Sequence, residues 1–320
     1  MKIVVLDAYS ANPGDLDWNI FSEIGELVLY DRTPAELTVE RIGDAEIVLS
    51  NKVALTADVI SACPNLKYIG VLATGYNIVD LGAASAANVV VTNVPAYSTD
   101  AVAQHVFALI LQLENEIALY DDEVQTGAWQ NSPDFTFSLF PWHELAGKNI
   151  GLVGFGNIGQ KVGKVANAFG MNVMAAPQRS MNDIVVDYPV AWTPLEEIYE
   201  TADIISLHCP LKDETIGMIN SKSLQKMKSS AVLVNTGRGP LINERDLADA
   251  LETGQIRAAA LDVLSQEPPE EDNPLIGLDN CIITPHIAWA SQEARRRLLN
   301  IAAGNINNFL GNKITNQVNS

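Results

Sequence analysis

The chain has 320 residues, 48% of them hydrophobic and 18% charged, which is the composition of a globular protein with a sizeable core. Its net charge of −19 argues against general electrostatic binding to nucleic acid or to an anionic membrane. No apolar run approaches the roughly 20 residues of a membrane span, the start lacks a signal peptide, and three scattered cysteines without metal-ligand spacing indicate free thiols in the cytoplasm and no metal site.

Residues 1–95 alternate predicted strands and helices. Short apolar runs predict strands at residues 2–6, 26–30, 47–49, 68–73 and 89–94. Helices are expected between them, at residues 15–24, 34–42, 56–62 and 79–87. Because nearly every residue of each strand is apolar, the sheet should be parallel and covered by helices on both faces.

One long helix is predicted from residue 99 to about residue 124. The connection that follows is rich in aromatic residues and proline, and includes Trp129, Phe135 and Trp142. Either it packs beneath the protein's own body, or it forms an interface with a second copy. We favour the second interpretation, which makes residues 115–145 a dimerisation segment and the protein a homodimer.

A second alternating unit follows over residues 148–285. Strands are predicted at residues 148–153, 172–176, 203–208, 231–235, 258–263 and 281–284, with helices that include residues 194–200, 221–227 and 244–252. A last helix, at residues 292–309, leaves open whether it packs on the first unit. The two alternations predict an α/β protein with two doubly wound parallel sheets.

A glycine-rich turn marks the start of the second unit. Gly154, Gly156 and Gly159 have G-x-G-x-x-G spacing between a predicted strand and a predicted helix. The first glycine permits the tight turn, the second lets the backbone approach a pyrophosphate, and the third allows close packing. Free N–H groups near Asn157 and Ile158 would then point at the phosphates. This context predicts a dinucleotide site.

The end of the next predicted strand bears on the choice between NAD and NADP. A NAD site of this type expects a carboxylate there for the ribose 2′-hydroxyl, but the chain has Pro177. Gln178, Arg179 and Ser180 follow, and an arginine at this place can pair with a 2′-phosphate. The alternative is a solvent-exposed turn with no cofactor role. We favour NADP over NAD.

Four histidines are candidates for proton chemistry. His105 lies in the middle of an apolar helix and is expected to be structural, while His143 lies in the aromatic connection. His208 ends a predicted strand and is expected to line the cofactor site without doing chemistry. His286 also follows a strand, and it comes shortly after a loop carboxylate, Glu267.

Arg238 lies between Gly237 and Gly239, directly after a predicted strand. It could be a surface arginine in a turn. Its alternative role is a planar fork that holds a carboxylate, and the strand end favours this role because ligands bind there in doubly wound sheets.

Five segments together resemble one family. GFGNIG, SLHCPL, VNTGRGPLI, ALDVLSQEPP and TPHIAWA, in this order and spacing over essentially the whole chain, resemble the D-isomer-specific 2-hydroxyacid dehydrogenases. VLATGYNIVD and PHIAWA look most like the glycerate dehydrogenase (hydroxypyruvate or glyoxylate reductase) branch. The resemblance implies two Rossmann-like domains: a discontinuous, flavodoxin-like substrate domain of residues 1–97 plus 288–320, and a dinucleotide-binding domain of residues 98–287 that forms the dimer.

The resemblance also implies the catalytic residues. Arg238 would anchor the substrate carboxylate, His286 would be the general acid in ketone reduction and the base in the reverse reaction, and Glu267 would bond to His286. Reduction of a carbonyl builds negative charge on oxygen, so a proton donor must lie within reach. A carboxylate beside an imidazole favours the charged, proton-loaded form of the imidazole.

Other residues carried over from the family would contact the two ligands. The backbone of Ala73, Thr74 and Gly75 would bind the other side of the substrate carboxylate. Thr236 and Asp262 would lie near the nicotinamide. The full set of implied cofactor contacts is Gly154, Gly156, Asn157, Ile158, Gly159, Gln178, Arg179, Ser180, His208, Cys209, Pro210, Thr236, Gly237, Asp262 and His286.

The expected activity is reduction of hydroxypyruvate and glyoxylate to D-glycerate and glycolate. Glu267 argues against formate, because formate dehydrogenases of the same superfamily carry glutamine there. D-lactate or other D-2-hydroxyacids remain open as alternatives. Phosphoglycerate is less favoured, because many enzymes that act on it add a C-terminal regulatory domain. A non-enzymatic, dinucleotide-sensing corepressor is the alternative from another class, and the complete set of Arg238, Glu267 and His286 argues against it.

Overall fold

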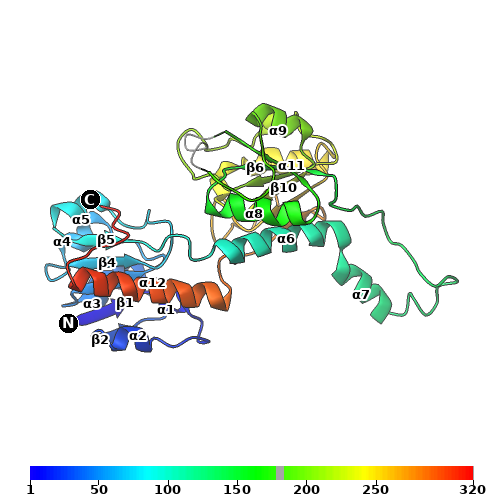
Figure 1. The fold of residues 1–320 in the computed structure, drawn as a ribbon. Coiled ribbons are helices and arrows are strands. Elements are labelled where there is room, and N and C mark those ends of the chain that lie inside the picture. The colour runs from blue at the N-terminus through cyan, green and yellow to red at the C-terminus, as the bar shows by residue number, and fades with distance from the viewer. Residues whose placement is uncertain (178–183, 320) are drawn as a thin grey trace. The chain divides into compact units, whose positions relative to one another are not determined.

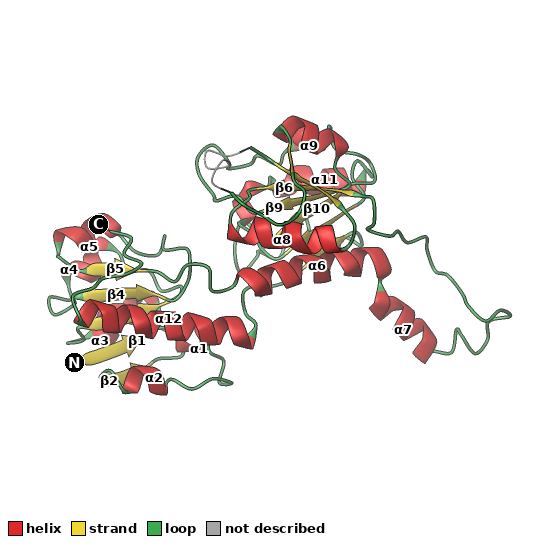
Figure 2. Cartoon of the chain, in the orientation of Figure 1, coloured by secondary structure: helices red, strands yellow, loops and turns green. Residues whose placement is uncertain are grey.

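The computed structural model describes residues 1–177 and 184–319, and it divides the chain into two compact units (Figure 1). The first comprises Met1–Ser98 and Trp289–Ser320, and the second comprises Thr99–Ala288. Each unit is a parallel sheet with helices packed on it (Figure 2), so the predicted α/β fold with two Rossmann-like sheets is confirmed. No helix among the described residues is long and apolar enough to cross a membrane.

The first unit has five parallel strands in the order β2-β1-β3-β4-β5, the flavodoxin-like order. The strands are β1 (Lys2–Val5), β2 (Glu26–Leu29), β3 (Ile47–Ser50), β4 (Tyr68–Val71) and β5 (Val90–Thr92). The helices are α1 (Ala8–Ala11), α2 (Asn19–Ser22), α3 (Thr38–Ile42), α4 (Ala57–Ser61), α5 (Leu81–Ala86) and α12 (Gln292–Leu310), with a 3-10 turn η1 (Ala35–Leu37) before α3.

The C-terminal helix α12 belongs to the first unit. Ile69 and its neighbours on one face of the sheet form a core with residues of α3, α4 and α5. Tyr68 alternates with Ile69 and therefore faces the other side, where its ring lies 5.0 Å from that of Phe309 on α12. Arg295 on α12 pairs with Asp15 at 2.6 Å, and this hydrogen bond holds the pKa of the Asp15 carboxyl at about 2.

The second unit has seven parallel strands in the order β12-β11-β10-β9-β6-β7-β8. The strands are β6 (Asn149–Val153), β7 (Asn172–Ala175), β8 (Ala191–Trp192), β9 (Ile204–Leu207), β10 (Val232–Asn235), β11 (Ala258–Leu261) and β12 (Cys281–Ile283). The helices are α6 (Thr99–Asn115), α7 (Ile117–Gln125), α8 (Asn157–Ala168), α9 (Leu195–Thr201), α10 (Ser221–Leu224) and α11 (Glu244–Glu252), with a 3-10 turn η3 (Gly239–Leu241) before α11.

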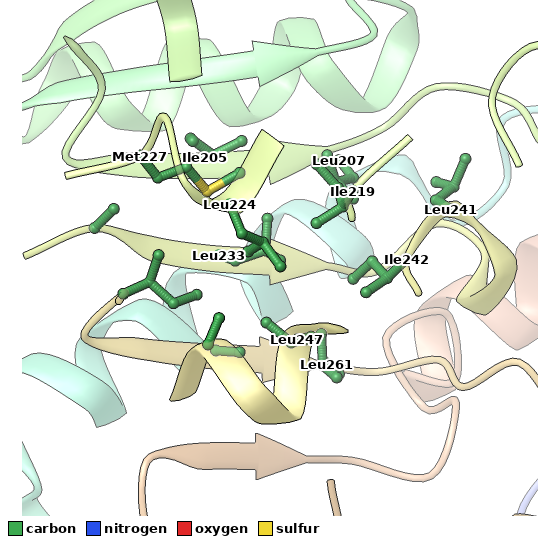
Figure 3. Close-up of a cluster of buried hydrophobic side chains, with 14 of the residues drawn as sticks. Ile205, Leu207, Ile219, Leu224, Met227, Leu233, Leu241, Ile242, Leu247 and Leu261 are labelled. Atoms are coloured by element: carbon green, nitrogen blue, oxygen red, sulfur yellow. The ribbon is translucent and has the colours of Figure 1, made fainter. Parts of the chain in front are cut away.

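Successive strand residues of the second unit enter two different cores. Ile205 and Leu233 pack against the layer of α9, α10 and α11, together with Leu247 of α11 (Figure 3). Ile204 and Val234, one position away, pack against the layer of α6 and α8. Because both faces are apolar, the strands read as continuous hydrophobic runs, and the helix layers cover both sides of the sheet.

The single helix predicted from residue 99 to about residue 124 is wrong. The structure has two helices, and the break falls at Glu116, whose φ of +41° is left-handed. The apolar spacing continues through Ile117, which is 69% exposed, so the pattern gave no sign of the break. The helix predicted at residues 15–24 is also much shorter, because only α2 forms there.

Candidate functional site

The segments predicted to carry the site lie at one edge of the second sheet. β12, β11, β10, β9 and β6 are successive neighbours and parallel, so their carboxyl ends point the same way. Residues 154–159 follow β6, residues 208–210 follow β9, residues 236–238 follow β10, residues 262–267 follow β11, and His286 follows β12. The chain passes from β6 through β7 and β8 on one side and then crosses to β9 on the other. The switch point between β6 and β9 is where ligands bind in such sheets.

The three glycines of the turn after β6 meet different surroundings. Gly154 has φ +100°, and a Cβ there would lie 2.5 Å from the backbone N of Cys209. A Cβ on Gly159 would lie 2.3 Å from the carbonyl oxygen of Gly154. A Cβ on Gly156 would meet nothing within 4 Å. Gly154 and Gly159 therefore permit close backbone packing, while Gly156 borders open space.

Two features of this edge fit a nicotinamide dinucleotide. Helix α8 begins at Asn157 with Gly156 as its N-cap, which offers no side-chain cap, so the first N–H groups of the helix receive no hydrogen bond from the cap and suit a pyrophosphate. Thr236, after β10, has a buried hydroxyl oxygen without a hydrogen-bond partner among the described residues. A buried polar atom of this kind has bonding capacity left for a polar group of a ligand.

His208 and Cys209 border the glycine turn, and both side chains are uncharged at neutral pH. Burial lowers the pKa of His208 to about 4, so its ring is neutral at neutral pH, and its Nε2 bonds to Ser206 Oγ at 2.9 Å. Burial raises the pKa of the Cys209 thiol, which contacts Met218 Sδ at 3.7 Å. Pro210, the next residue, is exposed.

Pro177 is exposed and follows β7, the neighbour of β6, at the same edge. It brings no carboxylate to that strand end. Gln178, Arg179 and Ser180 lie outside the described residues.

A clamped turn presents Arg238. Asn235, the last residue of β10, accepts a hydrogen bond from the Gly237 N–H at 3.0 Å and donates one to the Arg238 carbonyl at 2.9 Å. Arg238 is exposed, and its Nη1 donates to the Gly237 carbonyl at 2.8 Å. The described part of the chain gives this guanidinium no ion pair, so most of its donors remain available to an anion.

Gly239 brings the Arg238 turn against the loop that carries Glu267. A Cβ at Gly239 would lie 1.9 Å from the carbonyl carbon of Leu264, three residues before Glu267. Glu267 Oε1 accepts a hydrogen bond from the Leu264 N–H at 3.1 Å, and Oε2 lies 2.6 Å from His286 Nδ1. The side chains of His286 and Glu267 are 28% and 34% exposed, so the pair is accessible to a ligand.

Asp262 is 1% exposed and holds the segment that contains His286. Its carboxylate accepts hydrogen bonds from Thr284 Oγ1 at 2.6 Å and from the N–H groups of Ile287 and Ala288, both at 2.9 Å. Burial alone would raise the pKa of this carboxyl, but the nearby His105 ring, with its Nε2 3.5 Å from Oδ1, and these bonds outweigh burial and hold the pKa below the usual value. The sequence placed Asp262 only near the cofactor and missed Thr284, whose position before Pro285 and His286 was the available signal.

The residues implied for the substrate in the first unit follow β4, at the carboxyl edge of that sheet. Thr74 Oγ1 donates to the Val94 carbonyl at 2.9 Å, and the Thr74 carbonyl accepts from Asn93 Nδ2 at 2.7 Å. These bonds fix the backbone at Thr74, and the Ala73 carbonyl accepts a further one from the Val94 N–H at 3.0 Å.

Comparison with known proteins identifies the family of the chain. Residues 107–288 match the family described as D-isomer specific 2-hydroxyacid dehydrogenase, NAD binding domain. A hydroxypyruvate reductase of Blautia hydrogenotrophica is 46% identical over 100% of this chain and 100% of its own length. A glycerate dehydrogenase of Methylorubrum extorquens is 39% identical over 99% of this chain and 98% of its own.

A solved structure of an acyclic imino acid reductase in complex with NADPH and D-Arg superposes with a TM-score of 0.86 at 34% identity, covering 99% of this chain and 100% of that one. The likeness to these proteins extends over both units. The chain therefore belongs to the D-isomer-specific 2-hydroxyacid dehydrogenase family, whose members are oxidoreductases that use a nicotinamide dinucleotide.

Proposed function

We propose that this enzyme reduces hydroxypyruvate and glyoxylate to D-glycerate and glycolate. The observation that carries the proposal is the 2.6 Å contact between His286 and Glu267, beside a turn that presents Arg238 without an ion pair among the described residues. A proton donor next to a carboxylate anchor is what reduction of a 2-oxoacid requires. Full-length relatives named hydroxypyruvate reductase and glycerate dehydrogenase support the choice of substrate.

Each residue of this set has one role in the proposal. The Arg238 guanidinium binds the substrate carboxylate through paired, charge-assisted hydrogen bonds. His286 Nδ1 is engaged by Glu267, so Nε2 is the nitrogen that gives its proton to the carbonyl oxygen. Glu267 stabilises the imidazolium before this transfer. In the direction of oxidation, Nε2 takes the proton back from the hydroxyl.

The remaining contacts position the ligands. The N–H groups of Asn157 and Ile158 would hold the pyrophosphate, and Thr236 would offer its buried hydroxyl to the nicotinamide end. When bound, the nicotinamide supplies the hydride. As the likeness to the family implies, we also propose the backbone at Thr74 as a substrate contact.

We infer a preference for NADPH over NADH from the absence of a carboxylate at Pro177 and the presence of Arg179 in the sequence. The readout is the ratio of kcat/KM for the two cofactors. Arg179→Ala should lower that ratio. An unchanged ratio in the variant would remove Arg179 from cofactor selection.

We also infer a homodimer formed through residues 115–145. Large apolar side chains of this segment are uncovered in the single chain, with Ile117 69% exposed and Phe135 89% exposed. Such exposure favours an interface over packing beneath the protein's own body. The test is the mass in solution by light scattering: Phe135→Asp should shift a dimer towards monomer, and a monomeric wild type would rule the dimer out.

The test of the proposed activity is the initial rate of NADPH and of NADH oxidation with hydroxypyruvate, glyoxylate, pyruvate and a bulky 2-oxoacid. The proposal predicts the highest kcat/KM with hydroxypyruvate or glyoxylate. A preference for pyruvate or the bulky acid would instead favour the activity of a dehydrogenase for D-lactate or a larger D-2-hydroxyacid. Cofactor binding without turnover on any acid would favour the alternative of a non-enzymatic, dinucleotide-sensing corepressor.

A further inference from the structure

His105 on α6 lies next to the buried carboxylate of Asp262. Its side chain is 19% exposed, and its Nε2 lies 2.9 Å from Thr284 Oγ1 and 3.5 Å from Asp262 Oδ1. Thr284 Oγ1 donates its one proton to Asp262 Oδ1 at 2.6 Å, so towards His105 this oxygen can only accept. His105 Nε2 therefore carries a proton and donates it to Thr284. The direction of donation is His105 to Thr284 to Asp262.

The carboxylate of Asp262 also fixes the backbone directly after His286. Asp262 Oδ1 accepts from the Ile287 N–H and Oδ2 accepts from the Ala288 N–H, both at 2.9 Å, while the Asp262 carbonyl accepts from the His286 N–H at 2.8 Å. His286 has φ +54°, a left-handed conformation that a non-glycine residue keeps only when its surroundings enforce it. The hydrogen bonds of Asp262 are that enforcement.

We propose that His105 is a positioning residue for the turn at residues 284–288, which carries His286. It acts through Thr284, whose hydroxyl it orients towards Asp262, and through Asp262 on the turn at His286. Without the donor at His105, the Thr284 hydroxyl is free to rotate away, and the Asp262 carboxylate loses a bond that holds it in register with the turn. The effect on turnover rests on the proposed function of His286, while the effect on the turn does not.

The test compares three variants. His105→Leu removes the donor. His105→Gln keeps an N–H donor near the place of Nε2. Leu113→Ala is the matched control, because Leu113 is a partly buried residue of the same helix that packs on the core below α6 and is not part of the hydrogen-bond chain. Two readouts are taken from each: amide hydrogen exchange of the peptide at residues 284–288, and kcat with hydroxypyruvate at saturating cofactor.

The proposal predicts about tenfold faster exchange of that peptide and about tenfold lower kcat in His105→Leu, with the KM for the cofactor little changed. His105→Gln should restore most of both. Leu113→Ala should lower the melting temperature without affecting either. Exchange and kcat of His105→Leu equal to wild type would overturn the proposal, as would equal losses in His105→Leu and His105→Gln or in Leu113→Ala. If the wild type shows no turnover but exchange follows the predicted pattern, the proposed function fails and the positioning of the turn stands.

Discussion

Replacing Glu267 by glutamine, Glu267→Gln, removes the negative charge beside His286 with little change in shape. The amide side chain of the variant keeps one oxygen for the Leu264 N–H, which the carboxylate Oε1 accepts at 3.1 Å in the wild type. Its NH₂ group then faces His286 Nδ1, where the wild-type carboxylate oxygen lies at 2.6 Å. An amide donor at this place favours a neutral ring, which is a poor proton donor to a carbonyl oxygen.

The magnitude follows from the contact that is lost. A hydrogen bond between charged groups contributes about 1.5–3 kcal/mol, and the partial exposure of both side chains, 28% and 34%, places this pair at the lower end. A loss of about 1.5 kcal/mol from the transition state corresponds to a roughly tenfold lower kcat.

The assay is kcat for reduction of hydroxypyruvate from pH 6 to 9, with wild type and Glu267→Gln side by side. Binding of the dinucleotide, followed by fluorescence, is the control, and it should be unchanged because Glu267 is not among the proposed cofactor contacts. Equal kcat for the two proteins across the whole pH range would refute the role of Glu267.

Four other substitutions test single residues of the site and its surroundings. His286→Gln should lower kcat by about two orders of magnitude or more, while the Kd of the cofactor changes far less because the other implied cofactor contacts remain; normal turnover would exclude proton donation by this residue. Arg238→Ala should lower kcat/KM for 2-oxoacids by about 100-fold, since two charge-assisted bonds are lost, and undiminished efficiency would contradict the carboxylate anchor. Gly156→Ala should weaken cofactor binding by roughly tenfold or more at unchanged melting temperature, because its Cβ enters only the open space proposed for the pyrophosphate. Gly159→Ala should instead lower the melting temperature, because its Cβ would lie 2.3 Å from a backbone oxygen. The reverse pattern would contradict the assignment of the pyrophosphate site. The pKa of His208 in the folded chain is about 4, below the ordinary 6.5, so protonation of this ring favours the unfolded chain. The free energy of unfolding should therefore be unaffected by this group above pH 6.5 and should fall by roughly 3 kcal/mol as pH is lowered towards 4. A His208→Asn variant whose stability falls as steeply as that of wild type over this pH range would contradict the burial argument.

The fold was predictable because both sheets are buried on two faces. Strands covered on each side must be apolar throughout, so β9 and β10 stand out in the sequence as short hydrophobic runs. The turn after β6 was predictable for a steric reason, since the backbone approaches so closely at Gly154 and Gly159 that a Cβ has no space.

What escaped prediction depends on contacts between distant residues. The break at Glu116 lies inside a run of continuous helical spacing, and its left-handed φ is a backbone choice that the apolar pattern does not encode. His105 was expected to be only structural because its neighbours on the helix are apolar. Its partner Thr284 is 179 residues away, and only the folded sheet brings them within 2.9 Å.

The configuration of the product is the decisive test of the proposed reduction. Hydroxypyruvate and the preferred cofactor would be incubated with the enzyme, and the glycerate formed would be resolved by chiral chromatography, with Arg238→Ala and His286→Gln as matched controls. We expect D-glycerate alone from the wild type, and far slower formation of it by both variants. L-glycerate, a racemic product, or undiminished formation by either variant would contradict it.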